Sequence, residues 1–199
     1  MLSPPPRKLG VLLFDEFEPL DVFGPVELFG NLPKHYTVSF HAPQPGPVTG
    51  AIGTTVLAEH PMGEDVDILL VPGGMGTRRH IHDEEFVGRL RQWGLNTPLV
   101  ISVCTGSALL AAAGLLEGYR ATSNKRAFDW AASFGTNVQW VRQARWVADR
   151  DRWTSSGVAA GMDMTAALIA HLDGDDTSRT VCDMVELEVH HDPTQDPFA

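Results

Sequence analysis

The chain has 199 residues, 43% of them hydrophobic, which is enough for one buried core and predicts a single domain over residues 1–199. The formal net charge of −10 works against binding to a phosphate backbone, so we expect no nucleic-acid partner. The sequence holds no run near the roughly 20 apolar residues of a membrane span, and residues 1–8 lack the apolar core of a signal peptide, which predicts a cytoplasmic protein without a membrane partner.

In the first half of the chain, runs rich in Val, Ile and Leu alternate with helical patterns. This alternation is typical of a mostly parallel central sheet with helices on both faces. The runs predict strands at 9–14, 36–41, 67–71 and 99–103 and either a hairpin or an edge pair at 48–57. The helical patterns predict helices at 22–29, 84–93 and 105–116. The expected fold class is therefore α/β.

The second half of the chain continues the pattern with shorter segments. It predicts helices at 126–134, 159–172 and 177–189 and short strands at 138–141, 145–147 and 152–155. Four arginines (142, 145, 150 and 152) form a local basic cluster there, which we interpret as the solvated surface of a hairpin.

The two cysteines, Cys104 and Cys182, lie in different settings and are expected to be free thiols. Cys104 follows a predicted buried strand and precedes a predicted helix, with Ser102 and Gly106 as small neighbours. This spacing is typical of a nucleophile elbow. A position before a helix N-terminus also favours a thiolate over a thiol. We therefore predict a reactive nucleophile at Cys104 and a structural role for Cys182, which lies inside a predicted helix.

A glycine-rich turn, PGGMG at 72–76, ends the strand predicted at 67–71. Such a turn exposes backbone N–H groups that stabilise either an oxyanion or a phosphate. The Lys-Ser/Thr ending of a phosphate-binding loop is absent, and no G-x-G-x-x-G motif follows the first strand. The turn therefore favours an oxyanion hole.

Four carboxyl groups crowd the loop after the first predicted strand: Asp15, Glu16, Glu18 and Asp21. In a doubly wound sheet the carboxyl ends of the strands share one crevice, so one of these groups is expected to reach Cys104. Asp21 also precedes an apolar helix, where composition alone favours a helix N-cap. Both interpretations of Asp21 stay open on the residues alone.

Taken together, these motifs resemble the DJ-1/PfpI superfamily over nearly the whole chain, and within it the isocyanide hydratase-like branch that also supplies the ligand-binding halves of AraC-type regulators. The segments that carry the resemblance are VLLF (11–14), LDVFGP (20–25), DILLVPGG (67–74), SVCTG (102–106), AGLLEGYRAT (113–122) and SGVAAGMD (156–163).

The resemblance implies a flavodoxin-like fold, related to class I glutamine amidotransferases, and a homodimer without metal or organic cofactor. It implies Cys104 as nucleophile and Asp21 as the general acid/base. Thr105 would contribute its hydroxyl and backbone N–H, and the Gly74 N–H would complete an oxyanion hole.

The sequence departs from parts of the superfamily. Thr105 stands where peptidase-like and chaperone-like members have a His, and Asn124 stands where this branch often has one. An Asn does not transfer protons at neutral pH, so Asp21 alone would do the acid/base work or the substrate differs. The late His-x-Glu pair of glutamine amidotransferases is also absent, which argues against a glutaminase. The adjacent His190 and His191 are expected near the surface, outside any metal site.

Three functional hypotheses follow. The first is hydration of a small isocyanide to an N-formamide through a thioimidate on Cys104, with Asp21 as acid/base. The second is a glyoxal or oxidative-stress protein with a reactive Cys104. The third is a non-catalytic module that senses small molecules, without DNA binding because no recognition helix with basic flanks is present. In the first two the partner is a small electrophilic substrate.

Overall fold

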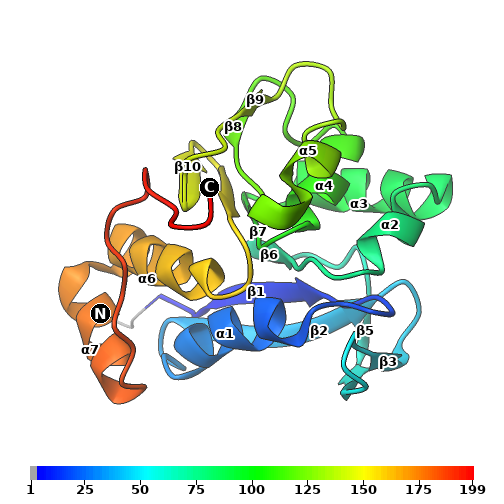
Figure 1. Cartoon of the computed structure of the whole chain (residues 1–199). Coiled ribbons are helices and arrows are strands. Elements are labelled where there is room, and N and C mark those ends of the chain that lie inside the picture. The colour runs from blue at the N-terminus through cyan, green and yellow to red at the C-terminus, as the bar shows by residue number, and fades with distance from the viewer. Residues whose placement is uncertain (1–3) are drawn as a thin grey trace.

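The computed structural model describes residues 4–199 and shows an α/β sandwich around a seven-stranded sheet of order β10-β11-β7-β6-β1-β2-β5 (Figure 1). All neighbouring strands in this sheet run parallel except β10, which is antiparallel to β11. The strands are β1 (Arg7–Leu12), β2 (Tyr36–Ala42), β5 (His60–Pro61), β6 (Ile68–Val71), β7 (Leu99–Ser102), β10 (Trp146–Asp149) and β11 (Arg152–Ser155). The predicted fold class is confirmed.

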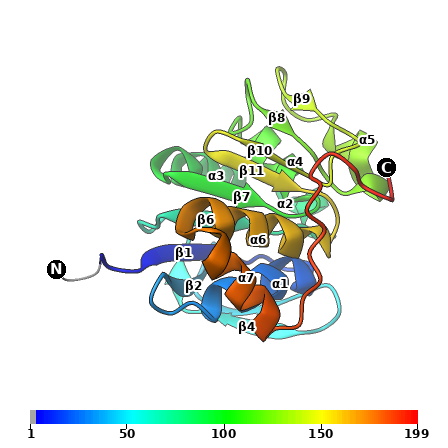
Figure 2. The ribbon, with the colours of Figure 1, turned by 90° about the vertical axis from the view of Figure 1, so that its left-hand side faces the viewer.

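Helices cover both faces of the sheet, as the sequence predicts (Figures 1 and 2). On one face lie α1 (Pro19–Gly30), α6 (Ala160–Asp173) and α7 (Asp175–Met184). On the other face lie α3 (Glu84–Asn96) and α4 (Gly106–Ala112). None of the helices within residues 4–199 is long and apolar enough to cross a membrane.

The central strands β6 and β7 position the site because both end at the same edge of the sheet. All four residues of β6 are buried, and β7 pairs with it from Ile68 opposite Leu99 to Val71 opposite Ser102. Strands buried on both faces are expected to read as continuous apolar runs, which is why these two were visible in the sequence. The loops after them carry the glycine-rich turn and Cys104.

Smaller elements lie outside the main sheet. The predicted hairpin is present as β3 (Gly46–Thr49) paired antiparallel with β4 (Thr55–Ala58). A second, parallel pair joins β8 (Arg120–Ala121) to β9 (Gln139–Trp140), so the strand predicted at 138–141 is only two residues long. The sequence analysis missed the short helix α2 (Thr77–His80) and the edge strand β5.

Three predicted helices are shorter than expected. Instead of a helix at 105–116, α4 ends at Ala112, because Gly114 turns to a φ of +70° and Arg91 donates to the Ala113 carbonyl. The helix predicted at 126–134 is a 3₁₀ turn, η1 (Lys125–Ala127), followed by the four-residue α5 (Phe128–Ala131). The last helix, α7, stops at Met184 rather than near 189.

The basic cluster is not a solvated hairpin, which corrects the sequence-based interpretation. Arg145 and Arg152 are buried, and only Arg142 and Arg150 are exposed. Arg152 donates to the backbone carbonyls of Leu115 and Gly94. These guanidinium groups therefore satisfy interior acceptors instead of facing water.

The Arg145–Asp163 ion pair links the sheet edge to α6 and to the C-terminal segment. Arg145 Nε lies 2.7 Å from Asp163 Oδ2, and both side chains are less than a tenth exposed. The other oxygen, Oδ1, accepts the His190 N–H at 3.0 Å. One buried carboxylate thus joins three segments that are distant in sequence.

We expect Asp163→Asn to lower the free energy of unfolding by about 3–5 kcal/mol, because it leaves the Arg145 charge buried without a counter-ion. Urea unfolding of the full chain measures this change. The matched control is Asp176→Asn, which removes an exposed ion pair with Arg179 and should cost about 1 kcal/mol or less. Equal effects of the two substitutions would contradict the prediction.

Candidate active site

Cys104 lies at a strained turn between β7 and α4. Its φ of +58° is in the left-handed region, which costs a non-glycine residue of order 1–3 kcal/mol unless the surroundings hold it. Here the Cys104 N–H donates to the Ser156 carbonyl at 3.0 Å. The Cys104 carbonyl accepts from the hydroxyls of Ser107 and Ser123 at 3.1 and 3.0 Å. Hydrogen bonds from three segments therefore fix the elbow.

Gly106 explains the small residue two positions after Cys104. A Cβ at Gly106 would lie 2.2 Å from the Val71 carbonyl oxygen, so no side chain fits there. The close approach brings the start of α4 against the end of β6. Cys104 is consequently placed beside the glycine-rich turn and is only 7% exposed.

The Asp21 carboxyl comes from α1 to the same place. It is fully buried, and its Oδ2 accepts the Gly73 N–H at 2.9 Å. The carboxyl also lies beside the Cys104 side chain, which lowers its pKa, and its Oδ1 has no hydrogen-bond partner among the described residues. The N-cap of α1 is Glu18, so the helix-cap interpretation of Asp21 is wrong.

The other three carboxyl groups of the acidic loop do not share this environment. Asp15 and Glu16 are exposed, and Glu16 pairs with Arg79 at 3.2 Å. Glu18 is half-buried and contributes only its charge near Asp21, whose pKa it raises further. Of the four candidates, Asp21 is the one that the fold brings to the thiol.

Burial shifts both groups of the Asp21–Cys104 pair toward their neutral forms. It raises the pKa of Asp21 to about 7, and the Gly73 N–H only partly opposes this. Burial and the nearby Asp21 charge likewise raise the pKa of the Cys104 thiol, which corrects the expectation of a thiolate favoured by the helix N-terminus. A carboxyl group that titrates near neutral pH is suited to exchange a proton with this thiol.

Three donors oppose the rise in the Cys104 pKa. They are the Thr105 N–H, the Thr105 hydroxyl and the Val158 N–H. Val158 has a φ of +32°, unusual for a β-branched residue, and the sequence analysis did not identify it as part of the site. The SGV segment at 156–158 was visible as a motif, but its contact with Cys104 depends on the start of α6 folding over the elbow.

Gly74 lies at the site, but its N–H is engaged. With a φ of +125° it donates to Thr105 Oγ1 at 3.1 Å. A Cβ at Gly74 would lie 2.3 Å from the Glu16 carbonyl oxygen, so glycine is required. Its contribution to an oxyanion hole stays a prediction, and it requires the Thr105 hydroxyl to release this N–H.

Asn124 lies at the border of the site. Its Oδ1 accepts the Ala127 N–H at 3.2 Å and caps η1. Its Nδ2 packs so closely on Gly157 that a Cβ there would approach within 2.5 Å. Asn124 therefore touches the residue next to Val158.

Lys125 holds the same loop in place through hydrogen bonds, and the sequence analysis assigned it no role. Its ammonium is buried and donates to the Thr122 hydroxyl and to the Ala144 carbonyl at 2.8 and 2.6 Å. Asp196 lies 3.9 Å away. Burial lowers the pKa of Lys125 to about 8, despite the opposing charge of Asp196.

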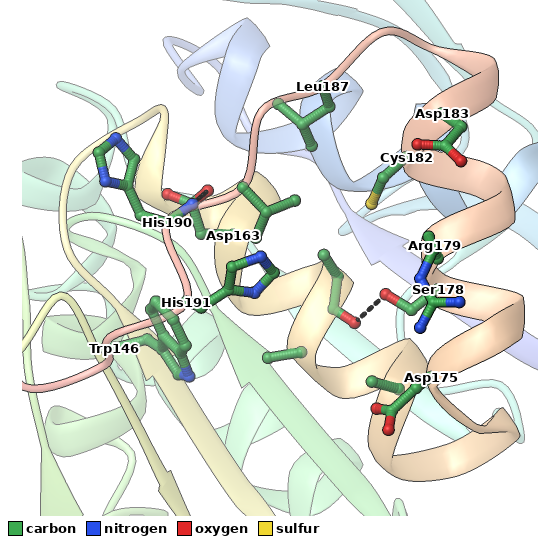
Figure 3. Close-up of a pocket in the computed structure, with 14 residues that line it drawn as sticks. Trp146, Asp163, Asp175, Ser178, Arg179, Cys182, Asp183, Leu187, His190 and His191 are labelled. Atoms are coloured by element: carbon green, nitrogen blue, oxygen red, sulfur yellow. Dashed lines mark hydrogen bonds between the residues drawn. The ribbon is translucent and has the colours of Figure 1, made fainter.

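A separate cavity of about 390 Å³ lies between α6, α7 and the C-terminal segment (Figure 3). Cys182 and His191 face it, and Ser178 closes one wall by donating to the Ala166 carbonyl at 2.8 Å. None of the residues around the Cys104 thiol lines this cavity. Across residues 4–199, no three His, Cys, Asp or Glu side chains are grouped to hold a metal ion.

Comparison with known proteins places this geometry in a family. The model of the DJ-1/PfpI family matches residues 7–171, so the chain belongs to that family, as its motifs indicated. The chain is 33% identical to isonitrile hydratase of Pseudomonas putida, over 96% of this chain and 81% of the relative. It is 31% identical to the HTH-type transcriptional regulator GbdR of Pseudomonas aeruginosa, over 92% of this chain but only 51% of the regulator. A solved THiJ/PfpI family protein from Pseudomonas syringae superposes with a TM-score of 0.85 at 31% identity, covering 94% of this chain and 78% of that one.

The raised pKa of Asp21 predicts a pH-dependent stability. Between pH 4 and 7 the folded protein keeps a proton on Asp21 that the unfolded chain has lost, so this carboxyl makes the protein less stable as pH rises through that window. Asp21→Asn removes the effect. We expect the variant to gain stability relative to the wild type, by a few kcal/mol between pH 4 and 7, with no further gain above pH 7.

Urea unfolding at each pH measures this difference. The matched control is Glu85→Gln, an exposed acidic residue in the first turn of α3, which should show no such gain. A stability difference between Asp21→Asn and the wild type that does not change with pH would contradict the prediction.

Proposed function

We propose that this protein hydrates small isocyanides to N-formamides, with Cys104 as nucleophile and Asp21 as general acid/base. The observation that carries the proposal is the buried Asp21 carboxyl beside the Cys104 side chain, with one oxygen free of hydrogen bonds within the described residues and a pKa near neutrality. Thr105 follows the cysteine, so no histidine is adjacent to take the proton. The similarity to isonitrile hydratase along 96% of the chain supports the same reaction.

In the first step Asp21 accepts the thiol proton as the sulfur attacks the terminal carbon of R–N≡C. The same proton is then delivered to that carbon, which gives the thioimidate R–N=CH–S–Cys104. Asp21 is again ionised at the end of this step. The hydrogen bonds from Thr105 and Val158 stabilise the negative charge on the sulfur while it develops.

In the second step water adds across the C=N bond. Asp21 takes a proton from the water and passes it to the nitrogen as the tetrahedral R–NH–CH(OH)–S–Cys104 forms, so Asp21 is again ionised. Collapse of this species breaks the C–S bond and releases R–NH–CHO, and Asp21 transfers the hydroxyl proton to the departing sulfur. The sum is one isocyanide and one water consumed for each formamide. Asn124 takes no proton in either reaction step, which fits the absence of a histidine at its position.

We expect the purified protein to convert an aromatic isocyanide to its formamide, followed by absorbance and confirmed by mass spectrometry. Cys104→Ser should abolish turnover. Asp21→Asn should lower kcat about 10²–10⁴-fold, the range for loss of a general acid/base. Cys182→Ser is the matched control and should leave turnover unchanged, since Cys182 lies in α7 away from the elbow. No turnover by a folded wild-type protein with a free Cys104 thiol would overturn the proposal.

A second candidate function is a small-molecule sensor. The similarity to the GbdR regulator and the 7% exposure of Cys104 favour it, because a sensor needs a closed site but no turnover. The Cys104→Ser variant distinguishes the hydratase function from the sensor function. A ligand that raises the melting temperature of wild type and Cys104→Ser equally, without product, supports the sensor.

We also propose that the chain forms a homodimer through the face of α1. Two residues near the start of α1, Leu20 and Phe23, are 42% and 36% exposed, and Met75 in the glycine-rich turn is 57% exposed. All three lie on segments that border the site, and exposed apolar side chains are typical of an interaction surface. A second copy on this face would cover the region around the buried Asp21.

Leu20→Lys should convert a dimer to a monomer, because the lysine charge would be buried without a partner. Size-exclusion chromatography with light scattering measures the mass. The matched control is Leu95→Lys on α3, where the leucine is 54% exposed on the other face of the sheet. A monomeric wild type, or a dimer that Leu20→Lys leaves intact, would contradict the prediction.

A further inference from the structure

Thr77 is a buried hydroxyl next to the site that the proposed mechanism does not use. It begins α2, is fully buried, and its Oγ1 lies 2.7 Å from the Gly74 carbonyl oxygen, to which it donates. Thr77 Oγ1 also lies 3.2 Å from Thr105 Oγ1. Thr77 therefore touches both groups expected to act beside the Cys104 thiol without touching the thiol itself.

The hydrogen-bonding capacity of Thr105 shows what this contact does. A threonine hydroxyl has one proton to donate and two lone pairs to accept with. One lone pair of Thr105 Oγ1 accepts the Gly74 N–H at 3.1 Å. Thr77 has a single hydroxyl proton, which it shares between the Gly74 carbonyl at 2.7 Å and the second lone pair of Thr105 Oγ1 at 3.2 Å. Both acceptor positions of the Thr105 hydroxyl are thereby engaged. The Thr105 hydroxyl is left to donate its own proton, and two acceptors are in reach, the Cys104 sulfur and the Gly74 carbonyl oxygen.

The alternative acceptor for the Thr105 proton is weak. The Gly74 carbonyl lies 3.4 Å from Thr105 Oγ1, and it already accepts from Thr77 at the shorter distance. When the sulfur carries negative charge, a hydroxyl that points at it forms a charge-assisted hydrogen bond, the stronger type. A chain of hydroxyls that donate in one direction also polarises each member.

We propose that Thr77 is a positioning residue that directs the Thr105 hydroxyl and the Gly74 peptide toward Cys104, and so favours the thiolate formed during the reaction. The role rests on the proposed function only for its effect on turnover. Its effect on the thiol needs no substrate. Thr77 acts through Thr105, so its contribution must vanish when the Thr105 hydroxyl is removed.

The test is the rate of Cys104 alkylation by iodoacetamide between pH 6 and 9, in a Cys182→Ser background so that one thiol reports. We expect Thr77→Val, which keeps the shape and removes the hydroxyl, to slow alkylation about 3- to 10-fold at each pH. A tenfold loss corresponds to about one unit of thiol pKa. Thr77→Ser should restore the rate to within about twofold, because it keeps the hydroxyl.

A double-mutant cycle with Thr105→Val separates positioning from a general effect on structure. In that background Thr77→Val should cause no further loss. An unchanged alkylation rate in folded Thr77→Val would overturn the proposal. So would an equal loss in the two backgrounds, or a Thr77→Ser variant as slow as Thr77→Val. Melting temperatures of all variants show that they are folded.

Turnover gives an independent reading. With an isocyanide substrate, Thr77→Val should lower kcat by the same factor as alkylation and leave KM unchanged, since Thr77 does not touch substrate. If the wild type does not turn over isocyanide but the alkylation cycle behaves as expected, the proposed function fails and the role of Thr77 stands. If turnover occurs but the Thr77→Val substitution does not change the alkylation rate, the proposed function stands and the role of Thr77 fails.

Discussion

The close approach of the Asp21 carboxyl to the Cys104 side chain depends on two chain segments that meet only because of the sheet. Asp21 is carried by α1 after the first strand, and Cys104 follows β7, two positions across the sheet from β1. The Gly73 N–H, from the loop after the intervening strand β6, holds the carboxyl in place. Burying an ionisable carboxyl is unfavourable, and the Gly73 hydrogen bond only partly offsets this, which is why the pKa of Asp21 rises to about 7.

The turn at Cys104 also contains unfavourable backbone conformations. A left-handed cysteine and a nearly left-handed valine lie within contact of each other at Cys104 and Val158. Neither conformation is favourable in isolation, so the surrounding hydrogen bonds must impose it. Ser107 and Ser123 bind the Cys104 carbonyl, and Lys125 fixes the loop that carries Ser123. The loops around the site are thus held by polar contacts, whereas the strands beneath are held by apolar packing.

Glycine allows several backbone segments to approach one another closely at the site. At Gly73 a Cβ would lie 2.6 Å from the Thr105 N and 2.9 Å from the Asp21 carboxylate, so any side chain there would separate the groups of the site. With no side chain in the way, three peptide segments approach the thiol. The polar groups at Cys104 are consequently mostly backbone N–H groups and hydroxyls, which are fixed in position and need little reorganisation when charge develops on the sulfur.

The sequence by itself determined the α/β class, the central strands and the elbow, because apolar runs between small residues have few alternative structures. It placed Cys104, the glycine-rich turn and an acidic loop at one edge of the sheet. It did not decide between a cap and an acid for Asp21 without the family resemblance, it interpreted Arg145 and Arg152 as surface charges, and it assigned no role to Lys125. Burial, partners and the raised pKa values arise from contacts between residues far apart in the chain. Only the tertiary structure brings Asp21 and Val158 to the thiol and Thr77 to Thr105, since no local pattern records which buried groups will face one another.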